Sequence, residues 1–114
     1  MKFKEELYGD VNVVSLDGKL VGGSEVNELH RVVKDCLDKK TNKIILDLRN
    51  VTWMGSVGIG ILICCLSGVR HAGGDLRLSG VNEKVKRLLE ITKLEKIFEV
   101  HPSIDQAVKS FNPV

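Results

Sequence analysis

Residues 44–63 read IILDLRNVTWMGSVGIGILI, and this stretch carries the clearest structural pattern in the sequence. Together with Lys43 just before it, the first part of this stretch, as far as Leu48, is a short and almost continuous apolar run. Such a run predicts a strand buried on both faces of a parallel or mixed sheet. We expect a loop over Arg49–Gly55. The next apolar stretch, Val57–Val69, is too long for a typical strand and therefore predicts a helix.

The segments before this stretch predict two strands and a helix. Residues 2–8 and 11–16 alternate loosely between apolar and polar side chains and are separated by Gly9-Asp10, as expected for strands joined by a tight turn. A helix over residues 24–39 follows, because its apolar positions recur at steps of three and four. Ser24 is its expected N-cap.

The segments after the stretch predict a further alternation of strands and helices. A strand at 76–78 is followed by a helix that Asn82 caps, a short strand at 97–100, and a last helix that Ser103 caps. The order is therefore β-β-α-β-α-β-α-β-α. It predicts an α/β fold with a mixed sheet of about five strands and four helices packed on it, in one domain over residues 1–114.

Composition excludes several classes of protein. The chain has 114 residues, a formal charge of +2 and 4% aromatic residues, which gives no positive signal for nucleic acid or a membrane surface as partner. Val57–Leu66 is much shorter than a bilayer span, so we expect no membrane insertion. The three cysteines, two of them adjacent, form a poor disulfide framework. We therefore expect a cytoplasmic protein.

Catalytic and metal-binding patterns are weak. His30, His71 and His101 lie far apart, and none has a partner at ligand spacing. The glycines of Gly55–Gly60 follow the spacing G-x-x-G-x-G, without the lysine of a phosphate-binding loop or the order of a dinucleotide site. A small-ligand or nucleotide site at this helix start is a remaining alternative. We expect no catalytic residue, metal or cofactor, and hence no enzyme.

Ser56 stands where the chain enters the helix after the central strand. In that position its hydroxyl can cap the free N–H groups of the first turn and still be exposed at the surface. A phosphate there would add about −1.5 to −2 charges near a helix N-terminus, which tolerates anions. A protein pressed against the helix would experience this charge strongly, which is the physical basis of a binding switch.

The helix after Ser56 is apolar on nearly every side. Four of its residues suit a face packed on the sheet, namely Ile59, Leu62, Ile63 and Leu66. Four others would point elsewhere without carrying charge, namely Ile61, Cys64, Cys65 and Gly68. Such a helix is either buried by its neighbours or lies against a partner. The residues leave both alternatives open.

The quoted stretch resembles the signature of the STAS domain family, which includes the bacterial anti-sigma factor antagonists. The family pattern is an apolar strand ending in Asp-Leu or Asp-Phe, a loop with an aromatic residue, a glycine-bracketed serine and an apolar helix. Here the aromatic residue is Trp53 and the switch segment is Met54–Gly60. The ending, LLEITKLEKIFEVHPSIDQAV at residues 88–108, is similar to the family's closing helix, short strand and last helix.

The resemblance implies a regulatory protein that takes part in partner switching. It would bind an anti-sigma factor that is also a serine kinase and thereby release a sigma factor for transcription. The kinase would phosphorylate Ser56 and end the complex, and a phosphatase would restore binding. ATP would belong to the kinase, so this chain would need no cofactor. The implied partner surface comprises Met54, Gly55, Ser56, Val57, Gly58, Ile59 and Gly60, together with Gly22, Gly23 and Ser24.

One residue departs from the family pattern. Members usually carry an aspartate directly before the phosphorylated serine, and here this residue is Gly55. The change removes a charge beside the switch and loosens the loop. It motivates an alternative role without phosphorylation, as a STAS scaffold or an accessory subunit of a sensor complex or membrane transporter. In either role we expect a monomer or a weak homodimer.

Overall fold

The computed structural model describes residues 1–112 and confirms the predicted order of elements. The strands are β1 (Lys2–Tyr8), β2 (Val11–Leu20), β3 (Lys43–Met54), β4 (Asp75–Ser79) and β5 (Val100–His101). The helices are α1 (Ser24–Asp38), α2 (Ser56–His71), α3 (Glu83–Ile91) and α4 (Ile104–Phe111), with one 3₁₀ turn, η1 (Leu94–Lys96).

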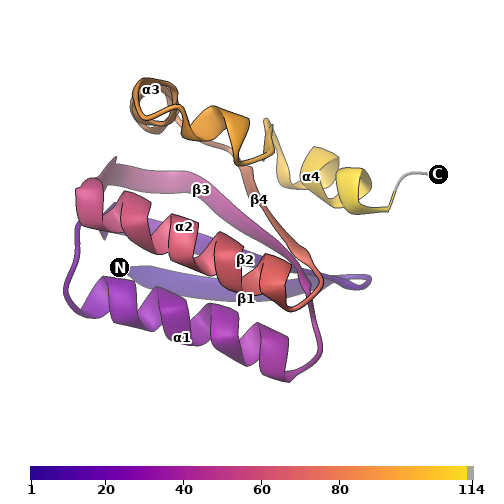
Figure 1. Ribbon diagram of the computed structural model, residues 1–114. Coiled ribbons are helices and arrows are strands. Elements are labelled where there is room, and N and C mark those ends of the chain that lie inside the picture. The colour runs from indigo at the N-terminus through magenta and orange to yellow at the C-terminus, as the bar shows by residue number, and fades with distance from the viewer. Residues whose placement is uncertain (113–114) are drawn as a thin grey trace.

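The five strands form one mixed sheet in the order β1-β2-β3-β4-β5 (Figure 1). β1 and β2 are an antiparallel hairpin, and each later strand pairs in parallel with the one before it. The helices between successive parallel strands act as crossovers, which is the usual way to connect parallel neighbours. β3 is therefore the central strand, as its apolar run predicted.

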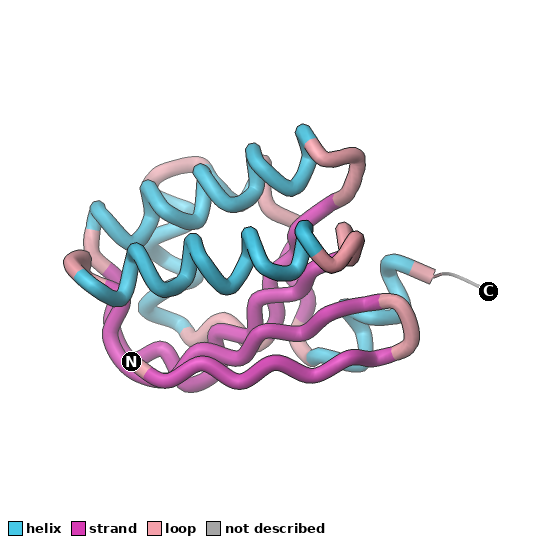
Figure 2. The backbone as a smooth tube through the Cα atoms, turned by 90° about the horizontal axis from the view of Figure 1, so that it is seen from below, coloured by secondary structure: helices cyan, strands magenta, loops and turns pink. Residues whose placement is uncertain are grey.

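The two longest helices, α1 and α2, lie side by side on one face of the sheet (Figures 1 and 2). Ile44, Leu46 and Leu48 of β3 point into the main core beneath them, and all three are buried. The core continues beyond β4, where α3 and η1 bury Leu89 and Leu94. These helices hide the apolar side chains that the alternation of the strands directs to this face.

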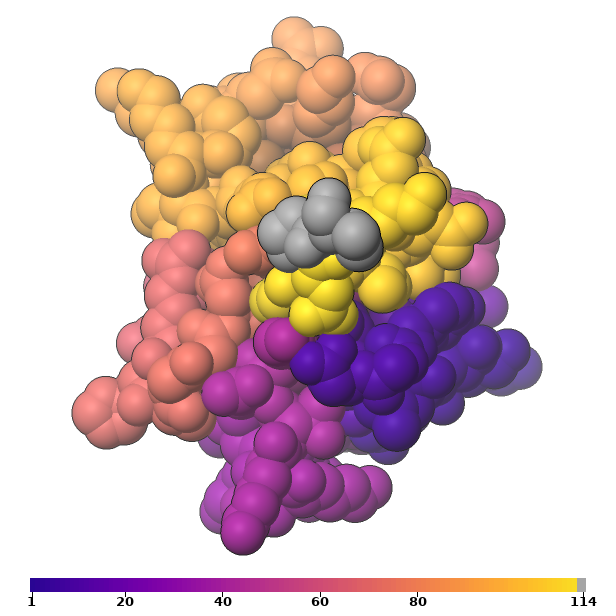
Figure 3. All heavy atoms as spheres, turned by 90° about the vertical axis from the view of Figure 1, so that its right-hand side faces the viewer, coloured from indigo at the N-terminus to yellow at the C-terminus, as the bar shows by residue number. Residues whose placement is uncertain are grey.

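α4 covers part of the opposite face of the sheet. Its Ala107 is buried against Val13 and Ile45 in a second, smaller cluster. Figure 3 shows the α4 segment in contact with the β1–β2 hairpin. There Lys43 Nζ donates hydrogen bonds to Asp10 Oδ2 at 2.6 Å and Asn112 Oδ1 at 2.9 Å. The last helix is thus fixed by apolar contacts and by this polar link.

Several predicted boundaries were wrong. β3 does not end at Leu48 but continues to Met54 through the expected loop, because it keeps pairing with β2 as far as Leu20↔Met54. The strand expected at 97–100 is mostly absent, since residues 97–99 follow η1 without strand structure and only Val100–His101 pairs with β4. The long β3 carries its chain directly to the start of α2.

Of the three N-caps predicted for α1, α3 and α4, two are confirmed and one is wrong. Ser103 Oγ and Asn82 Oδ1 accept backbone N–H groups of α4 and α3, so these two caps are confirmed. At α1, however, Gly23 occupies the N-cap position and Ser24 is the first helical residue, so its predicted capping role is wrong. Gly23 has φ +64°, a conformation that glycine adopts without steric cost.

The packing of α2 gives a paired prediction for stability. A Cβ on Gly58 would overlap the Leu20 carbonyl oxygen, whereas a Cβ on Gly60 would meet no atom within 4 Å. We expect Gly58→Ala to lower the free energy of unfolding by about 2 kcal/mol, through overpacking. Gly60→Ala should raise it by about 0.5–1 kcal/mol, because alanine is the better helix former. Urea denaturation followed by circular dichroism measures both, and equal effects would contradict this packing.

Candidate functional site

The site is built where β2 and β3 end and α2 begins. β2 and β3 finish in register at Leu20 and Met54. The next residue, Gly55, donates its backbone N–H to the Leu20 carbonyl oxygen at 3.0 Å. Gly55 is extended, with φ −96° and ψ −178°, and its own carbonyl oxygen accepts the first helical hydrogen bond, from Ile59 N. The strand ends thereby fix the position of the first turn of α2.

The two predicted partner-binding segments lie together at this end of the sheet. A Cβ on Gly22 would lie 3.6 Å from Val57 Cγ1, and a Cβ on Gly55 would lie 3.9 Å from Val21 Cα. The loop before α1 therefore contacts the start of α2. Met54 and Gly58 are buried, whereas Ser56, Val57 and Gly60 are exposed, as are Gly23 and Ser24. Which of these residues touch a partner stays a prediction.

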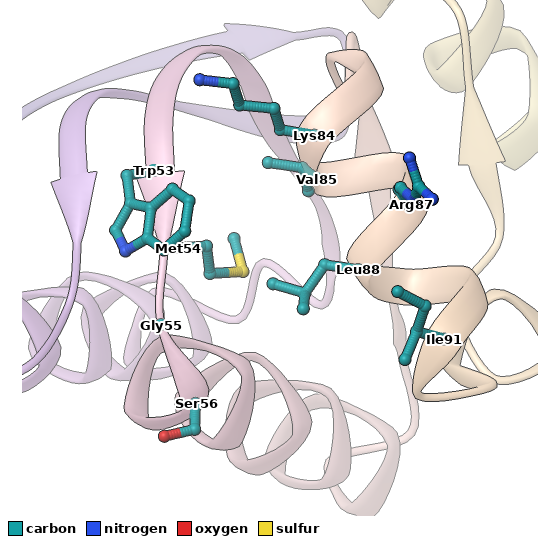
Figure 4. A pocket seen from close by; sticks show the side chains of 9 residues that line it. All are labelled: Trp53, Met54, Gly55, Ser56, Lys84, Val85, Arg87, Leu88 and Ile91. Atoms are coloured by element: carbon teal, nitrogen blue, oxygen red, sulfur yellow. The ribbon is translucent and has the colours of Figure 1, made fainter.

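Ser56 is the first residue of α2 and not its N-cap, since Gly55 holds the cap position. The predicted capping role is therefore wrong, because the extended Gly55 starts the helix one residue earlier. The Ser56 side chain is exposed and has no hydrogen-bond partner among residues 1–112. Figure 4 shows its hydroxyl directed away from Leu88 and Ile91 of α3. The oxygen is thus accessible to another molecule.

The electrostatic surroundings of Ser56 favour an anion. The first turn of α2 contains no acidic residue, and the helix carries no charged side chain before Arg70. Free N–H groups at a helix N-terminus provide about half a unit of positive charge, worth roughly 0.3–1 kcal/mol to an exposed anion. A phosphoryl group on Ser56 would therefore be tolerated by this helix.

A groove beside Ser56 was not anticipated from the sequence. It has a volume of about 450 Å³ and separates the end of β3 from α3. We call it the Trp53 groove, and it is lined by Trp53, Met54, Gly55, Ser56, Lys84, Val85, Arg87, Leu88 and Ile91 (Figure 4). Two of these side chains are largely exposed although they are apolar, Trp53 at 53% and Ile91 at 70%. The sequence did contain one signal for this groove, because Leu88 and Ile91 are apolar residues three positions apart in a charged helix.

The buried face of α2 also differs from the expected one. Ile61 and Cys65 are buried together with Leu62 and Leu66, whereas Ile63 is exposed and Ile59 is half-buried. The helix is apolar all round, so its sequence contains no periodicity from which the buried face could be identified. Its outer face is uncharged as far as Gly68 and includes the exposed thiol of Cys64.

The described part of the chain contains neither a metal-binding cluster nor a membrane-spanning helix. Among residues 1–112, no three acidic, histidine or cysteine side chains gather in a way that could hold a metal ion. His30 and His71 are exposed, and His101 Nε2 lies 2.8 Å from Glu99 Oε1. Over the same residues, no helix combines the length and the hydrophobicity that a membrane crossing requires.

Comparison with known proteins agrees with this architecture. The model of the STAS domain family matches residues 3–107. This chain belongs to the STAS domain family. It is 32% identical over 76 residues to the anti-sigma-B factor antagonist of Staphylococcus aureus, in an alignment that covers 67% of this chain and 70% of that protein.

Solved structures extend the comparison to the whole STAS fold. A Thermotoga maritima protein described as an anti-sigma factor antagonist has a TM-score of 0.87 and 28% identity, covering 96% of this chain and 93% of that one. The Bacillus cell fate determinant SpoIIAA, solved in its phosphorylated form, has a TM-score of 0.74 over 96% of this chain and 98% of that one. At 15% identity, the second likeness concerns the fold alone.

The glycine that departs from the STAS pattern is not required by the backbone. Gly55 has a negative φ, and a Cβ there would contact only Val21, at 3.9 Å and beyond. The backbone conformation and the space around this Cβ therefore do not demand glycine here. The missing carboxylate is a difference in charge next to Ser56 and not a consequence of a different fold.

The three cysteines should differ sharply in reactivity. Burial raises the pKa of both Cys36 and Cys65 to about 12, and a hydrogen bond to Glu5 contributes at Cys36. At pH 8 only about one in 10⁴ of these thiols would be ionised, and the thiolate is the reactive form. We expect one thiol, that of exposed Cys64, to react rapidly with a disulfide reagent in the native protein, and all three after unfolding in urea.

The matched control for this labelling is Cys64→Ser, which should abolish the rapid phase and leave the unfolded protein with two reactive thiols. The absorbance of the released thiol measures both phases. A rapid native reaction of two or three thiols would contradict the burial of Cys36 and Cys65.

Proposed function

We propose that this STAS protein is an anti-sigma factor antagonist that is switched by phosphorylation of Ser56. In this function it binds an anti-sigma factor of the serine-kinase type and so releases the sigma factor. Phosphorylation ends the complex, and a phosphatase restores it. The observation that carries the proposal is the exposed Ser56 hydroxyl, held at the N-terminus of an apolar helix that has no charged side chain before Arg70.

Support for a protein partner comes from the surroundings of Ser56. Val21, Trp53 and Val57 are large apolar side chains that are about half exposed at this end of the domain. Exposed apolar groups gathered on one surface are typical of protein interfaces. The curated relatives are named as antagonists of anti-sigma factors, and an anti-sigma factor is accordingly the partner that we assign to this surface.

Support for phosphorylation as the switch comes from the charge that it adds and from the absence, among the described residues, of an internal hydrogen bond to the Ser56 side chain. The partner's kinase would transfer the γ-phosphoryl group of its ATP to Ser56 Oγ, releasing ADP and the hydroxyl proton. The product adds about −1.5 to −2 charges to a surface whose apolar groups a partner must desolvate. The exposed Ser56 hydroxyl makes no hydrogen bond to another group of residues 1–112, so its modification breaks none.

The phosphoacceptor can be tested with a matched serine. Ser24 and Ser56 are both exposed, and each is the first helical residue after a glycine N-cap. Incubation with the cognate anti-sigma kinase and ATP should add one phosphoryl group, which mass spectrometry should locate on Ser56. Ser24→Ala should be phosphorylated normally, and Ser56→Ala not at all. Phosphate on Ser24, or on neither residue, would contradict the assignment.

The charge mechanism has its own test. Ser56→Asp should weaken binding to the anti-sigma factor tenfold or more, because a fixed carboxylate imitates part of the phosphoryl charge. Ser56→Ala should bind like the original protein, and so should Ser67→Asp, which places the same charge on an exposed serine of α2 outside the predicted partner surface. Titration calorimetry measures the affinities of the three variants and of the original protein. Equal affinity of Ser56→Asp and the original chain would remove charge at Ser56 as the reason for release.

A second function is favoured by Gly55, which lacks the charge usual beside the serine of the family. In it the chain is a STAS scaffold or an accessory subunit of a sensor complex or transporter, without phosphorylation. Gly55→Asp separates the two functions, since a Cβ at this residue makes only ordinary contacts with Val21. A faster phosphorylation of Ser56 in this variant supports the kinase pathway. No phosphorylation in either protein supports the second function.

A further inference from the structure

The Trp53 groove has the composition of a site for a polypeptide. Its α3 wall presents Lys84, Leu88 and Ile91 at steps of four and three, so the groove follows the helix for about 10 Å. Figure 4 shows Trp53 and Ile91 on opposite sides, with Met54 and Leu88 facing one another between them. Tryptophan, methionine and arginine are the side chains enriched in protein interfaces.

The charges of the groove are of one sign. Lys84 and Arg87 line it, and no carboxylate does. Neither cation forms an ion pair within residues 1–112, although α3 also contains Glu83 and Glu90. Two unpaired cations beside an apolar surface complement an occupant that carries carboxylates next to apolar side chains.

We propose that the Trp53 groove binds an acidic, amphipathic segment of the protein partner. Apolar side chains of the segment fill the space between Trp53 and Ile91, and its carboxylates pair with Lys84 and Arg87. The groove is continuous with the switch, because Met54, Gly55 and Ser56 belong to both. The inference deepens the proposed function and rests on it for the existence of a protein partner at this end of the domain.

The position of Ser56 gives this occupant a physical consequence. A phosphoryl group at the edge of the groove would repel the carboxylates that Lys84 and Arg87 attract. The same modification would not repel an uncharged segment and would attract a basic one. The positive charge of the groove selects acidic partners, and these are the partners that phosphorylation of Ser56 can release.

A small amphiphile with an anionic head is the competing occupant. Sites for small molecules generally bury 70–90% of their ligand, whereas this groove is open along its length and its two largest apolar walls are mostly or half exposed. These features favour a polypeptide that brings its own surface to cover Trp53 and Ile91. Dodecanoate is therefore included as a probe in the test.

The test uses Trp53, the single tryptophan of the chain, as a built-in fluorophore. The probes are three synthetic helical peptides: one with leucines at positions i, i+3, i+4 and i+7 and glutamates between them, one with lysines replacing the glutamates, and one with alanines replacing the leucines. We expect only the first to shift Trp53 emission to the blue. Amide NMR shifts should then map to Met54, Val85, Leu88 and Ile91.

Matched variants test the charges and the apolar wall separately. Reversal of both charges, Lys84→Glu with Arg87→Glu, should lower the affinity for the acidic peptide at least tenfold and allow the lysine peptide to bind. The same reversal at Arg31 and Lys34, which have the same spacing on the exposed side of α1, should change neither. Ile91→Ser should weaken the acidic peptide, whereas Leu7→Ser, at a similar exposure of 67%, should not.

Several results would overturn the inference. They are unchanged Trp53 emission at about 1 mM acidic peptide, equal binding of the lysine peptide, shifts mapping outside the groove, or equal effects of the two charge reversals. Binding of dodecanoate without the acidic peptide would assign the groove to a small amphiphile instead. The experiment uses unphosphorylated protein without kinase. Its failure is therefore distinct from the failure of Ser56 as phosphoacceptor, which the mass-spectrometric test reports.

Discussion

The contact between Gly58 and the Leu20 carbonyl group determines the geometry of the candidate site. A side chain at residue 58 would overlap the Leu20 oxygen, so only glycine lets α2 approach the end of β2 this closely. The neighbouring hydrogen bond, from Gly55 N to the same oxygen, ties the start of the helix to the strand. Together the two contacts place the first turn of α2 on the carboxyl ends of two parallel strands, where α/β sheets commonly bind their ligands.

The accessible serine follows from this arrangement. Because β3 continues to Met54 and Gly55 remains extended, the helix begins at Ser56 and the side chain has no internal partner to satisfy. A capping serine would have lost a hydrogen bond on modification, at a cost of roughly 1 kcal/mol to the helix. Here the glycine takes the cap position, and the hydroxyl contributes nothing to the stability of the domain. A modification of Ser56 can therefore change the free energy of partner binding without lowering the free energy of unfolding.

The sequence predicted what depends on local pattern and missed what depends on contacts between distant segments. The order of elements and the place of Ser56 followed from apolar periodicity and turn residues. The extension of β3 beyond Leu48 did not, since the polar Asn50 and its neighbours Val51 and Trp53 become strand there by pairing with β2. The buried face of α2 was misplaced by the uniform apolarity of the helix. The Trp53 groove required α3 to be folded beside β3, which no local pattern reports.

The groove and the serine together define how a small rigid domain could distinguish partners by charge. The core under α1 and α2 consists of buried apolar side chains, and closely packed cores of this kind resist deformation when a surface hydroxyl is modified. What changes is the local field: two cations on α3 and a helix N-terminus favour anions before modification, and a phosphoryl group offsets them afterwards. Discrimination of this kind needs no conformational change, because the difference in binding free energy arises from charge at the interface itself.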